Sequence, residues 1–120
     1  MRSALLLLAS MVVIVFYVVA TNIVPEIAAG ALLHPARRPV TQPPPAGCSA
    51  IEIAGDDVIL KGWRCDAIGE RRGTLVFLHG VADNRASVTG AIGRFTAKGF
   101  EVVAYDSRAQ GESTGDVCTY

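Results

Sequence analysis

Residues 74–106 read TLVFLHGVADNRASVTGAIGRFTAKGFEVVAYD, and this stretch decides the fold. It opens on a continuous apolar run at 74–78, which predicts a strand buried on both faces of a sheet. A second strand is predicted over 101–105, and residues 85–98 between the two have a helical pattern. Strand, helix and strand at this spacing predict a right-handed βαβ unit with parallel strands.

The helical pattern has a start, a face and an end. Asp83 or Asn84 can accept a hydrogen bond from the first free N–H groups and so cap the N-terminus. Spacings of four and three place three apolar side chains on one face: Val88, Ile92 and Phe95. Gly99 follows as a C-terminal stop, because glycine adopts the left-handed conformation that ends many helices. The segment is therefore an amphipathic helix.

A hairpin is predicted upstream of this unit. Residues 50–54 alternate apolar and polar like a half-buried strand, and residues 58–65 read as a second strand. Turn residues at 55–57 separate the two strands, which favours an antiparallel pair. A polar turn at 69–73 then leads into the apolar run. The predicted fold class is α/β, with an antiparallel hairpin leading into a βαβ unit.

The N-terminus is apolar on all sides. Residues 4–20 carry no charge, and Ile23 and Val24 extend the run. A segment of about 20 apolar residues is long enough to cross a bilayer. We therefore predict contact with membrane lipid through residues 4–24, as an uncleaved signal-anchor of a single-pass protein. The alternative is a signal peptide cleaved after Ala20, which would give an exported protein.

Charge does not decide which end of this apolar run faces the cytoplasm. Arg2 and the terminal amine lie before it, whereas Arg37 and Arg38 follow at some distance. The positive-inside rule therefore favours neither orientation.

Five of the six prolines lie in residues 35–47, where they favour an extended, semi-rigid chain. We expect this stretch to act as a spacer. The predicted organisation is a transmembrane or signal segment at 1–24, a Pro-rich linker at 25–47 and an incomplete α/β domain at 48–120.

Composition excludes several classes of function. The 11 basic and 11 acidic residues give a net charge of zero, so we predict no nucleic-acid partner. The odd number of cysteines lacks CxxC spacing, and the two histidines are isolated, so we predict no metal site and no cofactor. We expect Cys48, Cys65 and Cys118 to be ordinary small thiols, with a Cys48–Cys65 disulfide as the alternative in an exported domain.

Two loops follow the two strands of the βαβ unit, at the edge where open α/β sheets bind ligands. Residues 79–84 begin with His-Gly directly after Leu78, and residues 106–113 read DSRAQGES. Together they resemble the α/β-hydrolase superfamily, with its L-H-G turn after the third strand and its D-x-R-G-x-G-x-S loop after the fourth. The serine aminopeptidase-like and acyl-hydrolase branches are most similar. The resemblance covers residues 50–120 and departs at Ala109, where many members have glycine.

The resemblance implies a role for each loop. Acyl transfer to a serine creates an oxyanion that main-chain N–H groups stabilise, one of them from the loop after the third strand. The matching donor is the N–H of Val81, with Gly80 allowing close approach and His79 shaping the loop rather than acting as the base. An ordinary strand-ending turn is the alternative for His79 and Gly80. Three residues of the second loop are expected to be structural: Asp106, Arg108 and Ser113.

Residues 111–115 read GESTG and match the G-x-S-x-G pattern of a nucleophile elbow. An elbow needs a strand running directly into it and a helix directly after it, whereas polar residues 107–110 precede Ser113 and no helical pattern follows. The triad order in this fold is serine, acid, histidine, and no histidine follows Ser113. We therefore expect the nucleophile, acid and base to be absent from this chain, which looks like a fragment or a truncated reading frame.

The sequence thus predicts the N-terminal part of a membrane-anchored serine hydrolase acting on an ester, amide or thioester. A small acyl or peptide substrate is expected of the full-length enzyme, and no activity of these 120 residues alone. One alternative is a non-catalytic membrane protein. Another is a Rossmann-like nucleotide-binding module, although residues 79–84 lack the G-x-G-x-x-G phosphate loop.

Overall fold

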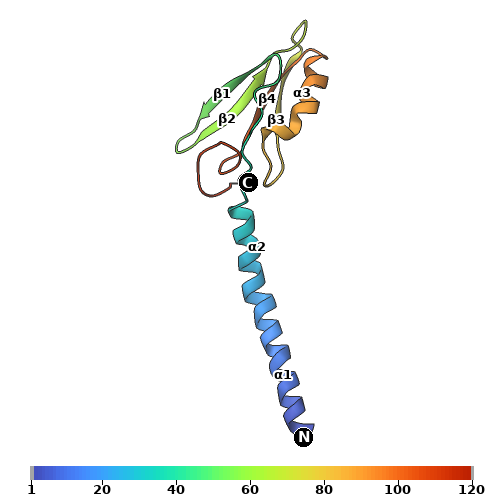
Figure 1. The fold of residues 1–120 in the computed structure, drawn as a ribbon, viewed down its shortest axis with the longest axis vertical. Coiled ribbons are helices and arrows are strands. Elements are labelled where there is room, and N and C mark those ends of the chain that lie inside the picture. Colours follow the sequence, from blue (N-terminus) through green and yellow to red (C-terminus); the bar gives the residue numbers. More distant parts are fainter. Residues whose placement is uncertain (1, 120) are drawn as a thin grey trace. The chain divides into compact units, whose positions relative to one another are not determined.

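A computed structural model describes residues 2–119, and the chain divides into two compact units, one ending at Leu33 and the other beginning at His34. The first unit is a single long helix (Figure 1), made of α1 (Arg2–Val18), a π-helical turn (Val19–Ile23) and α2 (Val24–Leu33). This helix of 32 residues is long and apolar enough to cross a membrane, a property that signal sequences share. It continues past residue 24, where the sequence predicts the end of the apolar segment.

The π-helical turn has a local cause in Pro25. A proline has no N–H, and its ring crowds the carbonyl four residues earlier, here that of Thr21. The widened turn brings the N–H of Val24 to the carbonyl of Val19. The helix therefore passes the proline without breaking.

The second unit is built on one mixed sheet of four strands in the order β1-β2-β4-β3 (Figure 1). The strands are β1 (Cys48–Ala54), β2 (Ile59–Cys65), β3 (Gly73–Leu78) and β4 (Phe100–Tyr105). β1 and β2 form the predicted antiparallel hairpin, β2 pairs antiparallel with β4, and β3 pairs parallel with β4. The predicted fold class, a hairpin leading into a βαβ unit, is confirmed.

The connection from β3 to β4 is helical, with a 3₁₀ turn (Arg85–Val88) followed by α3 (Thr89–Thr96). Its cap is Asn84 rather than Asp83, because the Asn84 side chain accepts the N–H of Ala86 over 2.9 Å. The α-helix is shorter than the predicted 85–98, because residues 85–88 form the 3₁₀ turn and the helix ends at its C-cap, Ala97. Gly99, at φ +82°, ends it as predicted.

The core lies between α3 and one face of the sheet. Its buried members come from β2, β4 and α3: Trp63, Cys65, Ile92, Val102 and Ala104. Val88 and Phe95 pack against this cluster, so the predicted apolar face of the helix is confirmed. Phe77 of β3 meets Phe95 with the ring centroids 5.6 Å apart, which extends the core to the edge of the sheet.

The opposite face of the sheet is uncovered along β3 within residues 2–119. The sequence predicts burial on both faces for the run 74–78, but Val76 is 60% exposed and Leu78 is 65% exposed. Side chains alternate along a strand, so Phe77 faces α3 while these two face away. β3 is also an edge strand. The prediction of two buried faces is wrong for the described residues, because α3 covers only one of them.

Residues 34–47 lie on the second unit and do not stand free as a spacer. Arg37 Nη1 donates to the carbonyl of Ser113 over 2.9 Å, and Asn84 Nδ2 donates to the carbonyl of Arg38 over 3.0 Å. In an extended, proline-rich chain the carbonyls have no local partner, so that of Arg38 can accept from Asn84. Of the segment expected as a linker, the first part is α2 and the rest contacts the folded unit.

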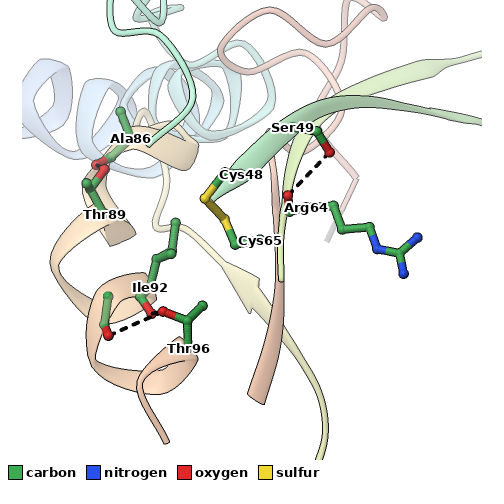
Figure 2. Close-up of a disulfide and its surroundings, with 9 residues drawn as sticks. Cys48, Ser49, Arg64, Cys65, Ala86, Thr89, Ile92 and Thr96 are labelled. Carbon is green, nitrogen blue, oxygen red and sulfur yellow. Dashed lines mark hydrogen bonds between the residues drawn. A yellow bond between two sulfur atoms is a disulfide. The ribbon is translucent and has the colours of Figure 1, made fainter. Parts of the chain in front are cut away.

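Cys48 and Cys65 form a disulfide, so the prediction of ordinary thiols is wrong for two of the three cysteines. The two residues are direct cross-strand partners, at the start of β1 and the end of β2. Formation of the hairpin therefore brings the two sulfurs together, on the side of the sheet where Ile92 of α3 lies (Figure 2). Cys118 is a free thiol and is 3% exposed.

Candidate functional site

The two loops that follow β3 and β4 meet at the carboxyl ends of these parallel strands. A hollow of about 380 Å³ opens there. Its lining comes from both loops, both strand ends and the C-terminal segment: Leu78, His79, Gly80, Val81, Tyr105, Ser107, Gln110 and Thr119. The structure thus brings together three of the predicted site residues, at the edge where open α/β sheets bind ligands.

His79 ties the two loops together. Its Nδ1 lies 2.7 Å from the carbonyl oxygen of Gly80, and its Nε2 accepts the main-chain N–H of Ser107 over 3.0 Å. A carbonyl oxygen only accepts, so Nδ1 carries the ring proton and Nε2 is the acceptor. Both ring nitrogens hold main-chain groups, which suits a residue that shapes the loop.

Val81, in the loop after β3, lines the hollow. Within residues 2–119 no hydrogen bond engages the N–H of Val81, and Val81 is 49% exposed. Ala82, at φ +56°, turns the chain, and the N–H of Asp83 reaches the carbonyl of Gly80 over 3.3 Å. A Cβ added to Gly80 would meet no atom within 4 Å, so the space beside the loop is open.

Asp106 is the centre of the second loop and is completely buried. Its Oδ1 accepts the main-chain N–H of Arg85 over 2.7 Å, and its Oδ2 accepts that of Glu112 over 2.9 Å. The Arg85 guanidinium forms an ion pair with the same carboxylate, as a buried charge requires. At Gly111, with φ +49°, a Cβ would collide with this carboxylate, so the loop closes over Asp106 only with glycine there.

Ser113 is completely buried, and its hydroxyl is engaged on both sides. Oγ donates to the carbonyl of Asp106 over 2.6 Å and accepts the main-chain N–H of Lys61 over 2.9 Å. Residues 107–119 form turns and irregular chain, so no helix follows this serine within the part of the chain that the structure describes. The geometry supports a structural role for Ser113 and does not present it as a nucleophile.

Arg108 reaches from the second loop to the turn between β1 and β2. Its Nη1 lies 2.6 Å from Asp57 Oδ1, and its Nε donates to the carbonyl of Val117 over 3.2 Å. The hydrogen bond from Arg108 lowers the pKa of Asp57 below its ordinary value, and the same bond raises the pKa of Arg108. These contacts support the bracing role predicted for this residue.

Sequence reasoning misses two buried polar residues at this edge. Arg85 is 6% exposed and lies over the Trp63 ring, with its guanidinium carbon 5.1 Å from the centroid. Gln110 is 3% exposed and lines the hollow; its Nε2 donates to Cys118 Sγ, while Oε1 has no partner within residues 2–119. The only local signal for Arg85 is its place directly after the helix cap. Gln110 sits among turn residues that carry no signal.

Comparison with known proteins supports the architecture. No protein-family model and no curated protein matches the chain. Among solved structures, an esterase from Pyrococcus furiosus in space group P21 is similar to it, with a TM-score of 0.61 and 29% identity over 72% of this chain and 36% of the esterase. The same esterase in space group P212121 gives a TM-score of 0.61 and 28% identity, over 72% and 35% of the two chains. The chain thus spans about a third of the esterase's length, and its folded unit has the N-terminal part of an α/β-hydrolase-like fold.

Proposed function

We propose that this chain is the N-terminal part of a membrane-anchored serine hydrolase and that it supplies the oxyanion loop of the active site. The observation that carries the proposal is the unengaged N–H of Val81 at the hollow beyond β3 and β4. The similarity to an esterase over 72% of the chain supports a carboxylic ester as the substrate class, with amides and thioesters as close chemical relatives.

The chemistry assigned to the loop is electrostatic. When a serine oxygen attacks the carbonyl carbon of an ester, the carbonyl oxygen becomes an oxyanion, and donors fixed in advance stabilise it. The Val81 N–H is one such donor, and the second in this fold follows the nucleophile. His79 and the left-handed Ala82 hold the loop in shape, so its N–H is positioned before substrate binds.

The nucleophile is assigned to a serine outside the described residues. Ser113 is the only G-x-S-x-G serine of the chain, and its Oγ is buried between Asp106 and Lys61. His79 uses both ring nitrogens on main-chain groups. Neither residue is therefore free for the attack or for proton transfer.

Membrane anchoring is proposed for the helix Arg2–Leu33. Its apolar side chains are exposed along α1 and α2, with no buried residue in either segment. Such a surface is unfavourable in water and favourable in a bilayer. A carbonate wash of membranes from cells that make the full chain should leave the anchored protein in the membrane pellet.

The catalytic assignment can be tested with a fluorophosphonate probe, which labels the activated serine of serine hydrolases. The natural polypeptide that contains this sequence would be labelled and digested, and the labelled peptide identified by mass spectrometry. We expect the label on a serine outside residues 2–119 and undiminished labelling in Ser113→Thr, which retains the buried hydroxyl. A label on Ser113, or no label on a folded protein, would overturn the proposal.

A second measurement uses the 120-residue chain alone. We expect hydrolysis of p-nitrophenyl acetate to stay at the background rate in detergent, because Ser113 and His79 are both engaged in hydrogen bonds to main-chain groups. Ser113→Thr and His79→Gln should give the same rate as the unaltered chain. Turnover that disappears in either variant would assign the chemistry to these residues and contradict the proposal.

A further inference from the structure

The Cys48–Cys65 disulfide lies in the core of the folded unit. Cys65 is 1% exposed and belongs to the buried cluster that includes Ile92, and Cys48 packs against the same cluster (Figure 2). Cytosolic thiols are kept reduced, whereas structural disulfides form and persist in the periplasm, the secretory pathway and the extracellular space. A disulfide inside the core therefore indicates the compartment in which this unit folds.

Composition argues against the main exception to that rule. Intracellular proteins of hyperthermophiles also contain disulfides, and such proteins are enriched in lysine and glutamate. This chain is not enriched in lysine. Its only lysines are Lys61 and Lys98. The disulfide is therefore read as a sign of an oxidising compartment.

We infer that the folded unit lies on the non-cytoplasmic side of the membrane, and that the helix Arg2–Leu33 crosses with its N-terminus in the cytoplasm. The orientation rests on the anchor in the proposed function. The side on which the folded unit lies rests on the disulfide, an independent observation.

The arginines that follow the helix do not oppose this orientation. Arg37 Nη1 donates to the carbonyl of Ser113 over 2.9 Å, and Nη2 donates to the carbonyl of Gly115. Arg37 therefore forms part of the folded unit through these two hydrogen bonds. The positive-inside rule itself favours neither orientation, since Arg2 and the terminal amine precede the apolar run and Arg37 and Arg38 follow it.

The third cysteine is compatible with an oxidising compartment. Cys118 is 3% exposed, and its thiol donates to the carbonyl of Arg108 over 3.2 Å. Thiol–disulfide exchange requires the attacking sulfur to be accessible, and a buried, hydrogen-bonded thiol is shielded from other sulfur atoms. Cys118 therefore does not compete with the Cys48–Cys65 pair.

The redox state can be measured on the full chain made in bacterial cells. Cells are quenched with acid, the protein is denatured, and free thiols are counted by gel shift with a polyethylene-glycol maleimide. We expect one adduct without reductant and three after reduction, because only Cys118 is unpaired. The Cys118→Ser variant should give none, and Cys48→Ser should give two. Three adducts without reductant would overturn the inference.

The side of the membrane can be measured without relying on correct folding. In a variant with all three cysteines changed to serine, a single cysteine replaces either Thr41 or Ser3, both of which are exposed. A membrane-impermeant maleimide is then added to intact spheroplasts. We expect labelling of Thr41→Cys, and labelling of Ser3→Cys only after the membrane is permeabilised. The reverse pattern would overturn the inference.

The two proposals fail in different ways. Suppose the chain is released by carbonate and has lost its first 20 residues, but still has one free thiol. The proposed anchor is then wrong, and the location of the folded unit outside the cytoplasm still holds. Suppose instead that the chain stays in the membrane, has three free thiols and is not labelled at Thr41→Cys in intact spheroplasts. The proposed anchor then stands, and the folded unit lies in the cytoplasm.

Discussion

The carboxylate of Asp106 accepts the main-chain N–H of Arg85 over 2.7 Å and forms an ion pair with the guanidinium of the same residue. One side chain thereby fixes the end of β4 to the start of the helical segment that follows β3. Glu112 adds a second carboxylate to Arg85 from the exposed side of the loop. The loop 79–84 ends directly before Arg85 and the loop 106–113 begins at Asp106, so this connection joins the two loops that line the hollow.

Asp106→Asn is expected to destabilise the folded unit by about 3 kcal/mol, because it leaves the buried Arg85 cation without its main counter-charge. The measurement is the denaturation midpoint in detergent, followed by the fluorescence of Trp63, the only tryptophan. Glu112→Gln is the matched control. Its carboxylate is 47% exposed, so the loss should stay below about 1 kcal/mol. Equal losses of stability in the two variants would show that the energy of the ion pair does not depend on its burial.

Ala109→Gly is expected to stabilise the folded unit by roughly 0.5–1 kcal/mol. Ala109 has φ +61°, where a residue with a Cβ costs about 1–2 kcal/mol, and this exceeds the entropy that glycine loses on folding. The left-handed conformation also explains why glycine is frequent at this position in the family that the loop resembles. Ala50→Gly, in β1, is the control and should reduce stability. A similar loss of stability in both variants would contradict the prediction that the backbone at Ala109 is strained.

Removal of the disulfide by Cys48→Ser with Cys65→Ser is expected to cost about 3 kcal/mol, because the bond closes a short loop in the unfolded chain. Reducing agent should lower the midpoint of the unaltered chain by a similar amount and leave the double variant unchanged. If reductant lowers the denaturation midpoint equally in both proteins, the effect of reductant comes from Cys118 or from the solvent and not from this disulfide.

Acid is expected to weaken the folded unit through Glu101. Hydrogen bonds from Arg64, at 2.7 and 3.1 Å, lower the pKa of this carboxyl below its ordinary value of 4.5. The lowered pKa contributes stability that is fully present above pH 4.5 and is lost as the pH falls through the folded-state pKa. Midpoints measured from pH 7 to pH 3 should fall more steeply for the unaltered chain than for Glu101→Gln. Glu70→Gln, at an exposed site, should follow the unaltered chain.

Local patterns were sufficient to predict the strands, the hairpin and the helix. An alternating run, a turn and a run of apolar residues each encode an element within a few neighbouring positions, and Gly99 marks the end of α3 by its own conformation. The candidate loop was predictable for the same reason, since His79 and Gly80 directly follow a strand. Such patterns do not encode which faces of a strand find a partner, and the exposure of Val76 and Leu78 was therefore missed.

Features that depend on register or on distant contacts could not be predicted. The Cys48–Cys65 disulfide could be predicted only as an alternative to ordinary thiols, because counting cysteines does not show that the two lie opposite each other in the hairpin. The pairing of Arg85 with Asp106 joins residues on either side of a helix and a strand. Nor does a proline-rich composition reveal that Arg37 is anchored on the folded unit.

The strand order has a consequence for how the sheet assembles during synthesis. β2 pairs with β4, so Cys65 can pair with Val102 only after β3 and α3 have been synthesised. The hairpin of β1 and β2 can form and be crosslinked early, but one side of β2 stays unpaired until the last strand arrives. Pairing over such a separation is slow. A ribosome paused before residue 100 would therefore hold a covalently closed hairpin without a sheet, and we expect protection from protease to begin only once β4 has emerged.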